Sequence, residues 1–114
     1  MAYGRRVSFE PVREMAFGSI GASYTAFTPV TTHYGRIVAI ENTTDVDVYI
    51  SVDGSTNALR IASGSGQVFD LCANEVPDDG FFFSEQTTFY CKAVSTSPSK
   101  GAVWIEYIYA SGGV

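Results

Sequence analysis

The chain has 114 residues, of which 46% are hydrophobic and 17% charged. This is the size of one domain, and the composition excludes a disordered chain. No apolar run approaches the roughly 20 residues needed to cross a bilayer, so no membrane contact is expected. The net charge of −5 is uneven, since residues 1–13 sum to +2 and residues 14–114 to −7. An acidic body disfavours nucleic acid as a partner, because phosphates are bound by Lys and Arg.

The basic N-terminus is predicted to be an extended arm, covering residues 1–12 of a single domain that spans 1–114. It lacks the apolar stretch of a secretory signal, which predicts folding in the cytoplasm. Arg5, Arg6 and Arg13 form a basic head that can dock on an acidic partner surface. On charge alone, a solvated terminal arm is the favoured interpretation.

Residues 10–18 leave two interpretations open. Pro11 can begin a short helix that Gly18 ends, or a strand can run through residues 15–17, which is favoured because so short a helix depends on packing. Residues 22–28 predict a strand interrupted by a bulge or an irregular edge, since Tyr24 and Phe27 break strict alternation.

Two strands over residues 35–42 and 46–52 are the clearest prediction. In the second, Val46, Val48, Ile50 and Val52 alternate with Asp47, Tyr49 and Ser51, which predicts a sheet with one buried face. The polar residues 42–45 suit a hairpin turn between the two strands, and residues 53–57 predict a second turn.

Later strands are predicted over residues 58–62, 67–73, 81–83, 87–94 and 102–110. In the segment 67–73 the core face is expected to hold Phe69, Leu71 and Ala73. The last strand is apolar on both faces, as expected of a strand at the centre of a sandwich or covered by a neighbouring chain. Eight or nine short strands predict an all-β fold, a small antiparallel β-sandwich or jelly-roll-like barrel with the extended N-terminal arm.

Catalytic and metal-binding motifs are weak. His33 is the single histidine, and no nucleophile or orienting acid lies near it in the sequence. Cys72 and Cys91 are too few for a zinc site, and reduced thiols are favoured over a disulfide in the cytoplasm. The acids at 45, 47 and 53 lack the spacing of a calcium loop and are interpreted as structural. We therefore expect no enzyme activity, metal or cofactor.

Aromatic residues are numerous, with seven Tyr, eight Phe and one Trp. Most are expected in the core. The excess over what a small core can hold predicts a contact surface, because soluble monomers rarely expose large apolar patches. The tyrosines considered for this excess are Tyr24, Tyr34, Tyr49, Tyr107 and Tyr109.

Several runs of the sequence resemble small β-rich structural proteins of tailed bacteriophages. These runs are 13–25 (REMAFGSIGASYT), 36–54 (RIVAIENTTDVDVYISVDG), 80–83 (GFFF), 89–92 (FYCK) and 101–109 (GAVWIEYIY). The resemblance implies a non-enzymatic, multi-copy virion component that assembles in the host cytoplasm. It would be a capsid accessory (decoration or cement) protein or a neck or tail ring component.

Its expected partners are copies of itself and other virion proteins, such as the major capsid, portal or adaptor, or tail proteins. The predicted partner-binding residues are Arg5, Arg6, Arg13, Tyr49, Trp104, Tyr107 and Tyr109.

Two other functions compete with this one. A carbohydrate-binding module at a host-contacting tail part would need coplanar exposed rings, for which Tyr34, Tyr49 and Trp104 are candidates. A small hydrolase would depend on His33.

Overall fold

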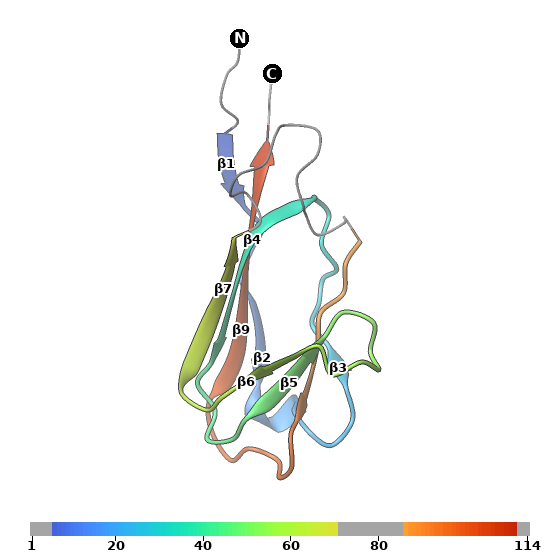
Figure 1. Ribbon diagram of the computed structural model, residues 1–114, viewed down its shortest axis with the longest axis vertical. Coiled ribbons are helices and arrows are strands. Elements are labelled where there is room, and N and C mark those ends of the chain that lie inside the picture. Colours follow the sequence, from blue (N-terminus) through green and yellow to red (C-terminus); the bar gives the residue numbers. More distant parts are fainter. Residues whose placement is uncertain (1–5, 71–85, 112–114) are drawn as a thin grey trace.

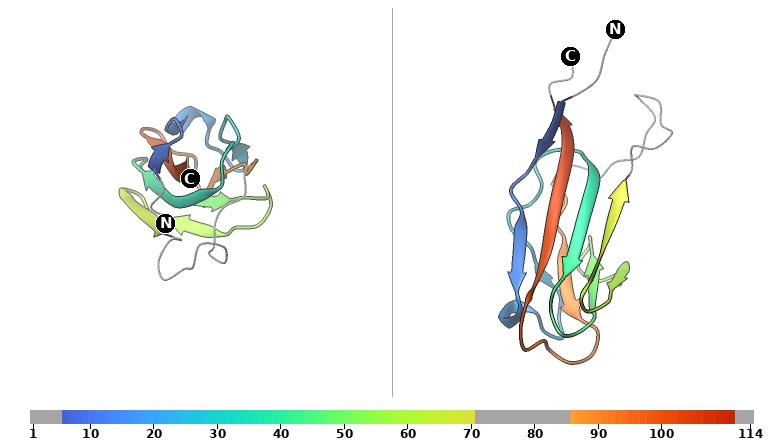
Figure 2. Two further views of the ribbon diagram at one scale, coloured as in Figure 1. Left: turned by 90° about the horizontal axis from the view of Figure 1, so that it is seen from above. Right: turned by 90° about the vertical axis from the view of Figure 1, so that its left-hand side faces the viewer.

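The computed structural model describes residues 6–70 and 86–111, and in these ranges the protein is all-β. Two antiparallel sheets face one another, as Figures 1 and 2 show, so the predicted small β-sandwich is confirmed. The elements are β1 (Arg6–Phe9), β2 (Arg13–Ala16), a 3-10 turn η1 (Phe17–Ser19), β3 (Thr25–Ala26), β4 (Gly35–Asn42), β5 (Val48–Ser51), β6 (Leu59–Ile61), β7 (Ser65–Asp70), β8 (Tyr90–Ala93) and β9 (Ala102–Ser111).

The larger sheet is built around β9, the longest strand. β4 pairs with one edge of β9, and β7 lies beyond β4. β1 and β2 share the other edge of β9, β1 beside its C-terminal half and β2 beside its N-terminal half. Pro11 lies between these two strands and has no N–H to donate, which fits the break in the ladder. Figure 2 shows β9 with β1 and β2 on one side and β4, followed by β7, on the other.

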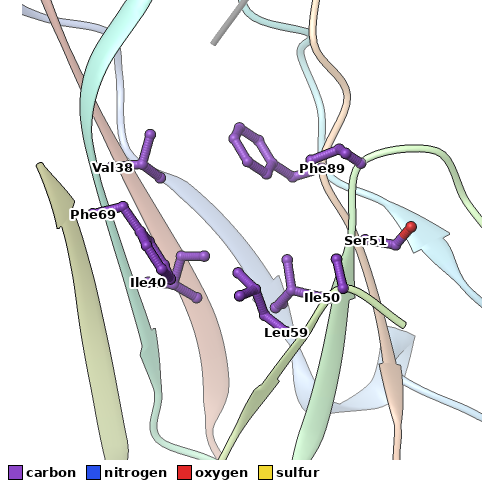
Figure 3. Close-up of a pocket in the computed structure, with 9 residues that line it drawn as sticks. Val38, Ile40, Ile50, Ser51, Leu59, Phe69 and Phe89 are labelled. Atoms are coloured by element: carbon purple, nitrogen blue, oxygen red, sulfur yellow. The ribbon is translucent and has the colours of Figure 1, made fainter. Parts of the chain in front are cut away.

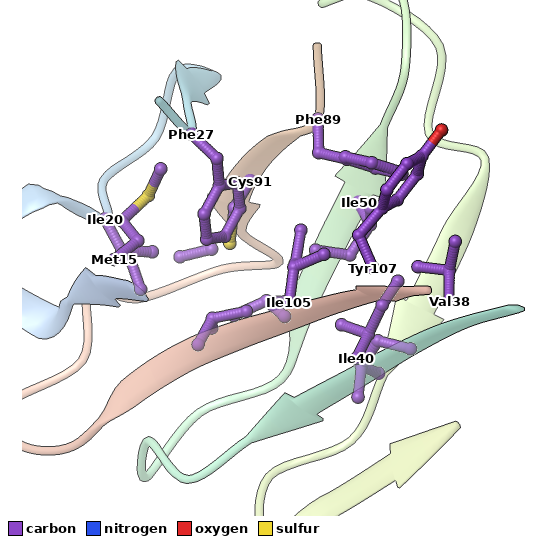
Figure 4. Close-up of a cluster of buried hydrophobic side chains, with 14 residues drawn as sticks. Met15, Ile20, Phe27, Val38, Ile40, Ile50, Phe89, Cys91, Ile105 and Tyr107 are labelled. Atoms are coloured by element: carbon purple, nitrogen blue, oxygen red, sulfur yellow. The ribbon is translucent and has the colours of Figure 1, made fainter. Parts of the chain in front are cut away.

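The smaller sheet has the order β3-β8-β5-β6. Its inward residues meet those of the larger sheet in a core that Figure 4 shows in part. Val38, Val48, Ile61, Val103 and Ile105 have no exposed surface, and fully burying such a side chain stabilises the fold by about 1.5–3 kcal/mol. The core is therefore drawn from strands of both sheets.

The connection between β4 and β5 corrects one prediction. Residues 42–45 do not form a hairpin turn, because β4 and β5 belong to different sheets. The buried side chain of Asn42 holds this corner: Nδ2 donates to the carbonyls of Val46 at 2.9 Å and Ile61 at 3.1 Å. Its Oδ1 accepts the backbone N–H of Thr44 at 2.9 Å. The amide thus replaces ladder hydrogen bonds where the chain changes sheet.

Two details of the strand over residues 46–52 also differ from the prediction. β5 ends at Ser51, and Val52 is 48% exposed, not part of the buried face. Ser51 is buried, and its hydroxyl is satisfied there because Oγ accepts the backbone N–H groups of Asp53 and Gly54 and donates to the Asp53 carboxylate. The predicted turn over residues 53–57 is confirmed as part of the link between the paired strands β5 and β6.

The N-terminal predictions are resolved in favour of strands. Residues 13–16 form β2 and residues 17–19 a 3-10 turn, so the helix alternative is wrong. Residues 6–9, expected in an arm, pair with β9 as β1, because the end of that strand offers a free edge there. The strand expected over 22–28 is reduced to the two residues of β3. Residues 71–73 and 81–83, with Cys72, lie outside the described residues.

Candidate functional site

A buried ion pair lies where the chain passes from β1 to β2. Arg13 Nη2 donates to Glu10 Oε1 at 2.7 Å, and the side chains are 2% and 3% exposed. The remaining guanidinium contacts go to backbone carbonyls, including that of Pro29 at 2.7 Å from Nε and that of Val30 at 3.2 Å. Arg13 therefore fastens the segment before β4 to the edge of the larger sheet.

His33 joins this pair through the second oxygen of Glu10. Its Nδ1 lies 2.8 Å from Oε2, which also accepts the backbone N–H of Thr32 at 2.9 Å. The imidazole stacks on Tyr109 with the ring centroids 3.6 Å apart. Burial raises the pKa of Glu10, but hydrogen bonds from His33, Arg13 and Thr32 outweigh it and hold the pKa below its ordinary value. The carboxylate is thus charged at neutral pH.

An acid that orients a histidine is one part of a nucleophilic site, which also needs a hydroxyl or thiol nucleophile within reach of the imidazole. The described hydroxyl bonded to His33, that of Thr32, contacts the same Nδ1 at 3.1 Å and not Nε2. The described thiol, Cys91, lies in the core, where burial raises its pKa to about 12. Among the described residues, the cluster of Glu10, Arg13 and His33 therefore has the geometry of a structural clamp.

The outer face of the larger sheet is apolar and acidic, and we call it the acidic face. Strand register places Phe9, Ile108 and Ile37 in one row across β1, β9 and β4. The neighbouring row holds Ala39 and Val68, flanked by the carboxylate of Glu106. Phe9 is 67% and Val68 68% exposed. Large exposed side chains thus lie at both edges of this face, with the half-buried Ile37 and Ile108 between them.

Trp104 lies on the same face among three glutamates. Glu14 of β2 and Glu41 of β4 are its direct cross-strand neighbours, one on each side. Glu106 is two residues along β9 and points to the same face. All three glutamates are exposed, and Trp104 is half-buried. A shallow groove of about 290 Å³ runs beside the indole and is lined by Glu41, Glu106 and Val68. This arrangement can receive a cationic group against the ring and between carboxylates.

The outer face of the smaller sheet carries a second aromatic group, the tyrosine cluster of Tyr24, Tyr49 and Tyr90 with Lys92. The Lys92 ammonium lies 4.7 Å from the ring centre of Tyr24 and 5.9 Å from that of Tyr49. Tyr90 meets Tyr24 edge to face, with centroids 6.5 Å apart. The amine lies over the rings of Tyr24 and Tyr49, so a ligand that stacks there would have to displace it.

A cavity of about 230 Å³ opens between the two sheets and is drawn in Figure 3. Its walls are aliphatic and aromatic, with Ile40, Leu59, Phe69 and Phe89 among them. The hydroxyl of Ser51, also in the lining, is engaged with the following loop. The described residues of the wall therefore offer no free polar group that could orient a substrate.

The predicted partner-binding residues do not form one surface. Arg13 and Tyr107 are buried, and this corrects the prediction that they contact a partner: the first is held by Glu10, and the second donates its hydroxyl to the His33 carbonyl at 2.9 Å. Tyr109 is half-buried against the imidazole.

The other predicted residues are divided between the two sheets. Tyr49 and Trp104 lie in different sheets, so they cannot share a flat platform with Tyr34. Arg6 lies in β1, and Arg5 is outside the described residues. The glutamates around Trp104 and the Glu10–His33 contact were not predicted.

The acids considered for calcium hold loops instead, as interpreted from the sequence. The carboxylate of Asp45 accepts from the backbone and hydroxyl of Ser99, and Asp47 pairs with Arg60. Asp53 accepts the backbone N–H groups of Ser55 and Thr56, and these bonds hold its pKa well below the usual range. Within residues 6–70 and 86–111, no three metal-ligating side chains gather closely enough to hold an ion. The same ranges contain no helix of the length and apolarity that crossing a membrane demands.

Comparison with known proteins gives no relative: no family model, no curated protein and no solved structure matches the chain.

Proposed function

We propose that this protein is a non-enzymatic structural component of a tailed-phage virion, present in many copies and acting by contact with neighbouring subunits. Its place would be in the particle, as a capsid accessory protein or part of a neck or tail ring, after assembly in the host cytoplasm. The phage context rests on the resemblance of the sequence runs described above. The contact function rests on one structural observation, the exposed apolar rows of the acidic face.

Two properties of the acidic face support a role in association. Phe9 and Val68 expose about two thirds of their surface on strands of the same sheet. Burying such side chains against a neighbour is favourable, at about 25 cal/mol for each Å² of apolar area. The carboxylates beside them would form the polar part that most protein interfaces carry around an apolar centre.

The proposal is tested by sedimentation of the purified full chain over a wide concentration range. We expect concentration-dependent oligomers, weakened by Val68→Asp on the acidic face. The matched control is Val52→Asp, the same change at an exposed valine next to β5 of the smaller sheet. Mass spectrometry of purified particles should find the chain in stoichiometric amounts. A protein that stays monomeric and is missing from particles would refute the proposal.

Glycan binding is a second candidate, now carried by the tyrosine cluster, in which Tyr49 is the one ring that was named for this function from the sequence. Tyr24, Tyr49 and Tyr90 gather on one outer face, and rings of this kind stack on sugars. A glycan array probed with the wild-type protein and with Tyr49→Ala tests this. Binding that the substitution abolishes would support a carbohydrate-binding module, and silence of the wild type would remove it.

A further inference from the structure

We infer that the three-glutamate surround of Trp104 on one copy receives the arginine-bearing N-terminal segment, residues 1–6, of a neighbouring copy. This inference rests on the proposed function, since it names the contact by which copies associate. The basic head of one copy and the acidic face of another would thus be the two sides of one contact. The contact is heterologous, because two different surfaces of the same chain meet.

Charge complementarity selects the occupant. Trp104 has Glu14, Glu41 and Glu106 at three of its four adjoining positions on the face, and the groove beside the indole is bounded by two of them. A guanidinium is planar, stacks on an aromatic ring and donates to carboxylates in its plane, so it satisfies both features of this site. Residues 5 and 6 are consecutive arginines in a chain whose residues 14–114 carry a net charge of −7.

The other basic side chains of the described residues are less suited to this contact. Arg13 is buried against Glu10, and Arg60 is paired with Asp47. Lys92 lies over the rings of the tyrosine cluster. Lys100 interacts electrostatically with the carboxylate of Asp45, and Arg36 is a single basic residue that already has an interaction of its own. The N-terminal arginines are therefore the segment of this chain that best complements the acidic face.

Strand register shows that the contact must form between copies. Arg6 pairs with Ser111 at the far end of β9, seven residues from Trp104, which is about 24 Å along an antiparallel strand. The Cα of Arg5 lies only about 3.8 Å from that of Arg6. An arginine side chain is much shorter than the remaining distance. The arginines of one copy thus cannot reach their own Trp104, whereas those of a neighbour can.

Charge reversal in two sets of variants tests the inference. Arg5→Glu/Arg6→Glu makes both contact surfaces acidic, and Glu41→Lys/Glu106→Lys makes both basic. Each variant alone should self-associate about tenfold more weakly than wild type or worse, because like charges then face one another across the contact. Mixed together, they should associate with wild-type strength. The acidic N-terminal segment of the first variant then meets the basic face of the second, and the basic segment of the second meets the acidic face of the first. The mixing result also shows that both variants are folded.

The chain's single tryptophan provides a second measurement. Trp104 emission should change as wild-type protein associates, and this change should disappear in Arg5→Glu/Arg6→Glu and return in the mixture. The control is Arg60→Glu, an exposed charge reversal in the smaller sheet, which should leave association unchanged. Wild-type oligomers that persist unaltered in both reversed variants would overturn this inference and leave the proposed function standing. A wild type that never associates would remove both.

Discussion

The buried ion pair makes a quantitative prediction at Glu10. Glu10→Gln keeps the shape of the side chain and removes the charge opposite Arg13, whose side chain is only 2% exposed. Removing one partner of a buried pair costs about 3–5 kcal/mol, because the other charge stays buried without compensation. The three carbonyls that accept from Arg13 place the expected loss near the lower end of this range. Domains are stable by only about 5–15 kcal/mol, so the loss is large.

The assays are urea unfolding and thermal unfolding, both followed by the emission of Trp104, at neutral pH and through a series of acid buffers. At about 4 °C per kcal/mol for a domain of this size, the melting temperature should fall by about 12 °C or more. The matched control is Glu14→Gln, an exposed glutamate four residues along, which should change stability by less than about 0.5 kcal/mol.

The pH dependence has a definite sign. The pKa of Glu10 is lower in the folded protein than its ordinary value of 4.5, so its contribution is fully present above pH 4.5. This contribution disappears as the pH falls through the lower folded pKa, when the carboxyl becomes protonated. The difference between wild type and Glu10→Gln should therefore shrink in acid. A variant as stable as wild type at neutral pH, or a difference that stays constant in acid, would refute this reasoning.

Three further predictions concern stability and thiol reactivity. Asn42→Ala removes the amide that donates to the carbonyls of Val46 and Ile61 and accepts the backbone N–H of Thr44, so it should lower the free energy of unfolding by about 2 kcal/mol or more, measured in urea. Gly101→Ala should cost about 1–3 kcal/mol or more, because φ is +89° and a Cβ would lie 2.2 Å from the Thr43 carbonyl oxygen; Gly18→Ala, with open space around it, is the control and should be nearly neutral. In a Cys72→Ser background, Cys91 should resist Ellman's reagent at pH 8 until denaturant is added, since burial raises its pKa to about 12; rapid labelling of the folded protein would contradict this.

The alternation of side chains predicted the strands well, because the two faces of a strand are a local property. β4 was predicted to the residue, and β9 differs from its prediction by one. Which strands pair is not local. The failed hairpin at residues 42–45 shows this, since the side chain of Asn42 finds one of its partners in Ile61, nineteen residues away.

The candidate site was predictable in part for the same reason. Trp104 was identified from the sequence because its strand is apolar on both faces. The glutamates around it come from β2 and β4, and only the register of those strands on β9 places them beside the indole. His33 was set aside for want of an orienting acid, and Glu10 supplies one from 23 residues away. In both cases the missing information is a pairing between distant segments.

The three glutamates of the acidic face restrict how copies can associate. A symmetric contact of two acidic faces would bring Glu14, Glu41 and Glu106 of one copy against the same residues of another. Like charges in such a contact cost several kcal/mol, so a two-fold dimer through this face is disfavoured at neutral pH. When the N-terminal segment of one copy binds the acidic face of the next, this repulsion is avoided. The same rotation then relates each copy to the following one. Such head-to-tail contacts close into rings if the rotation closes and otherwise continue as filaments, and a closed ring would suit the proposed neck or tail component.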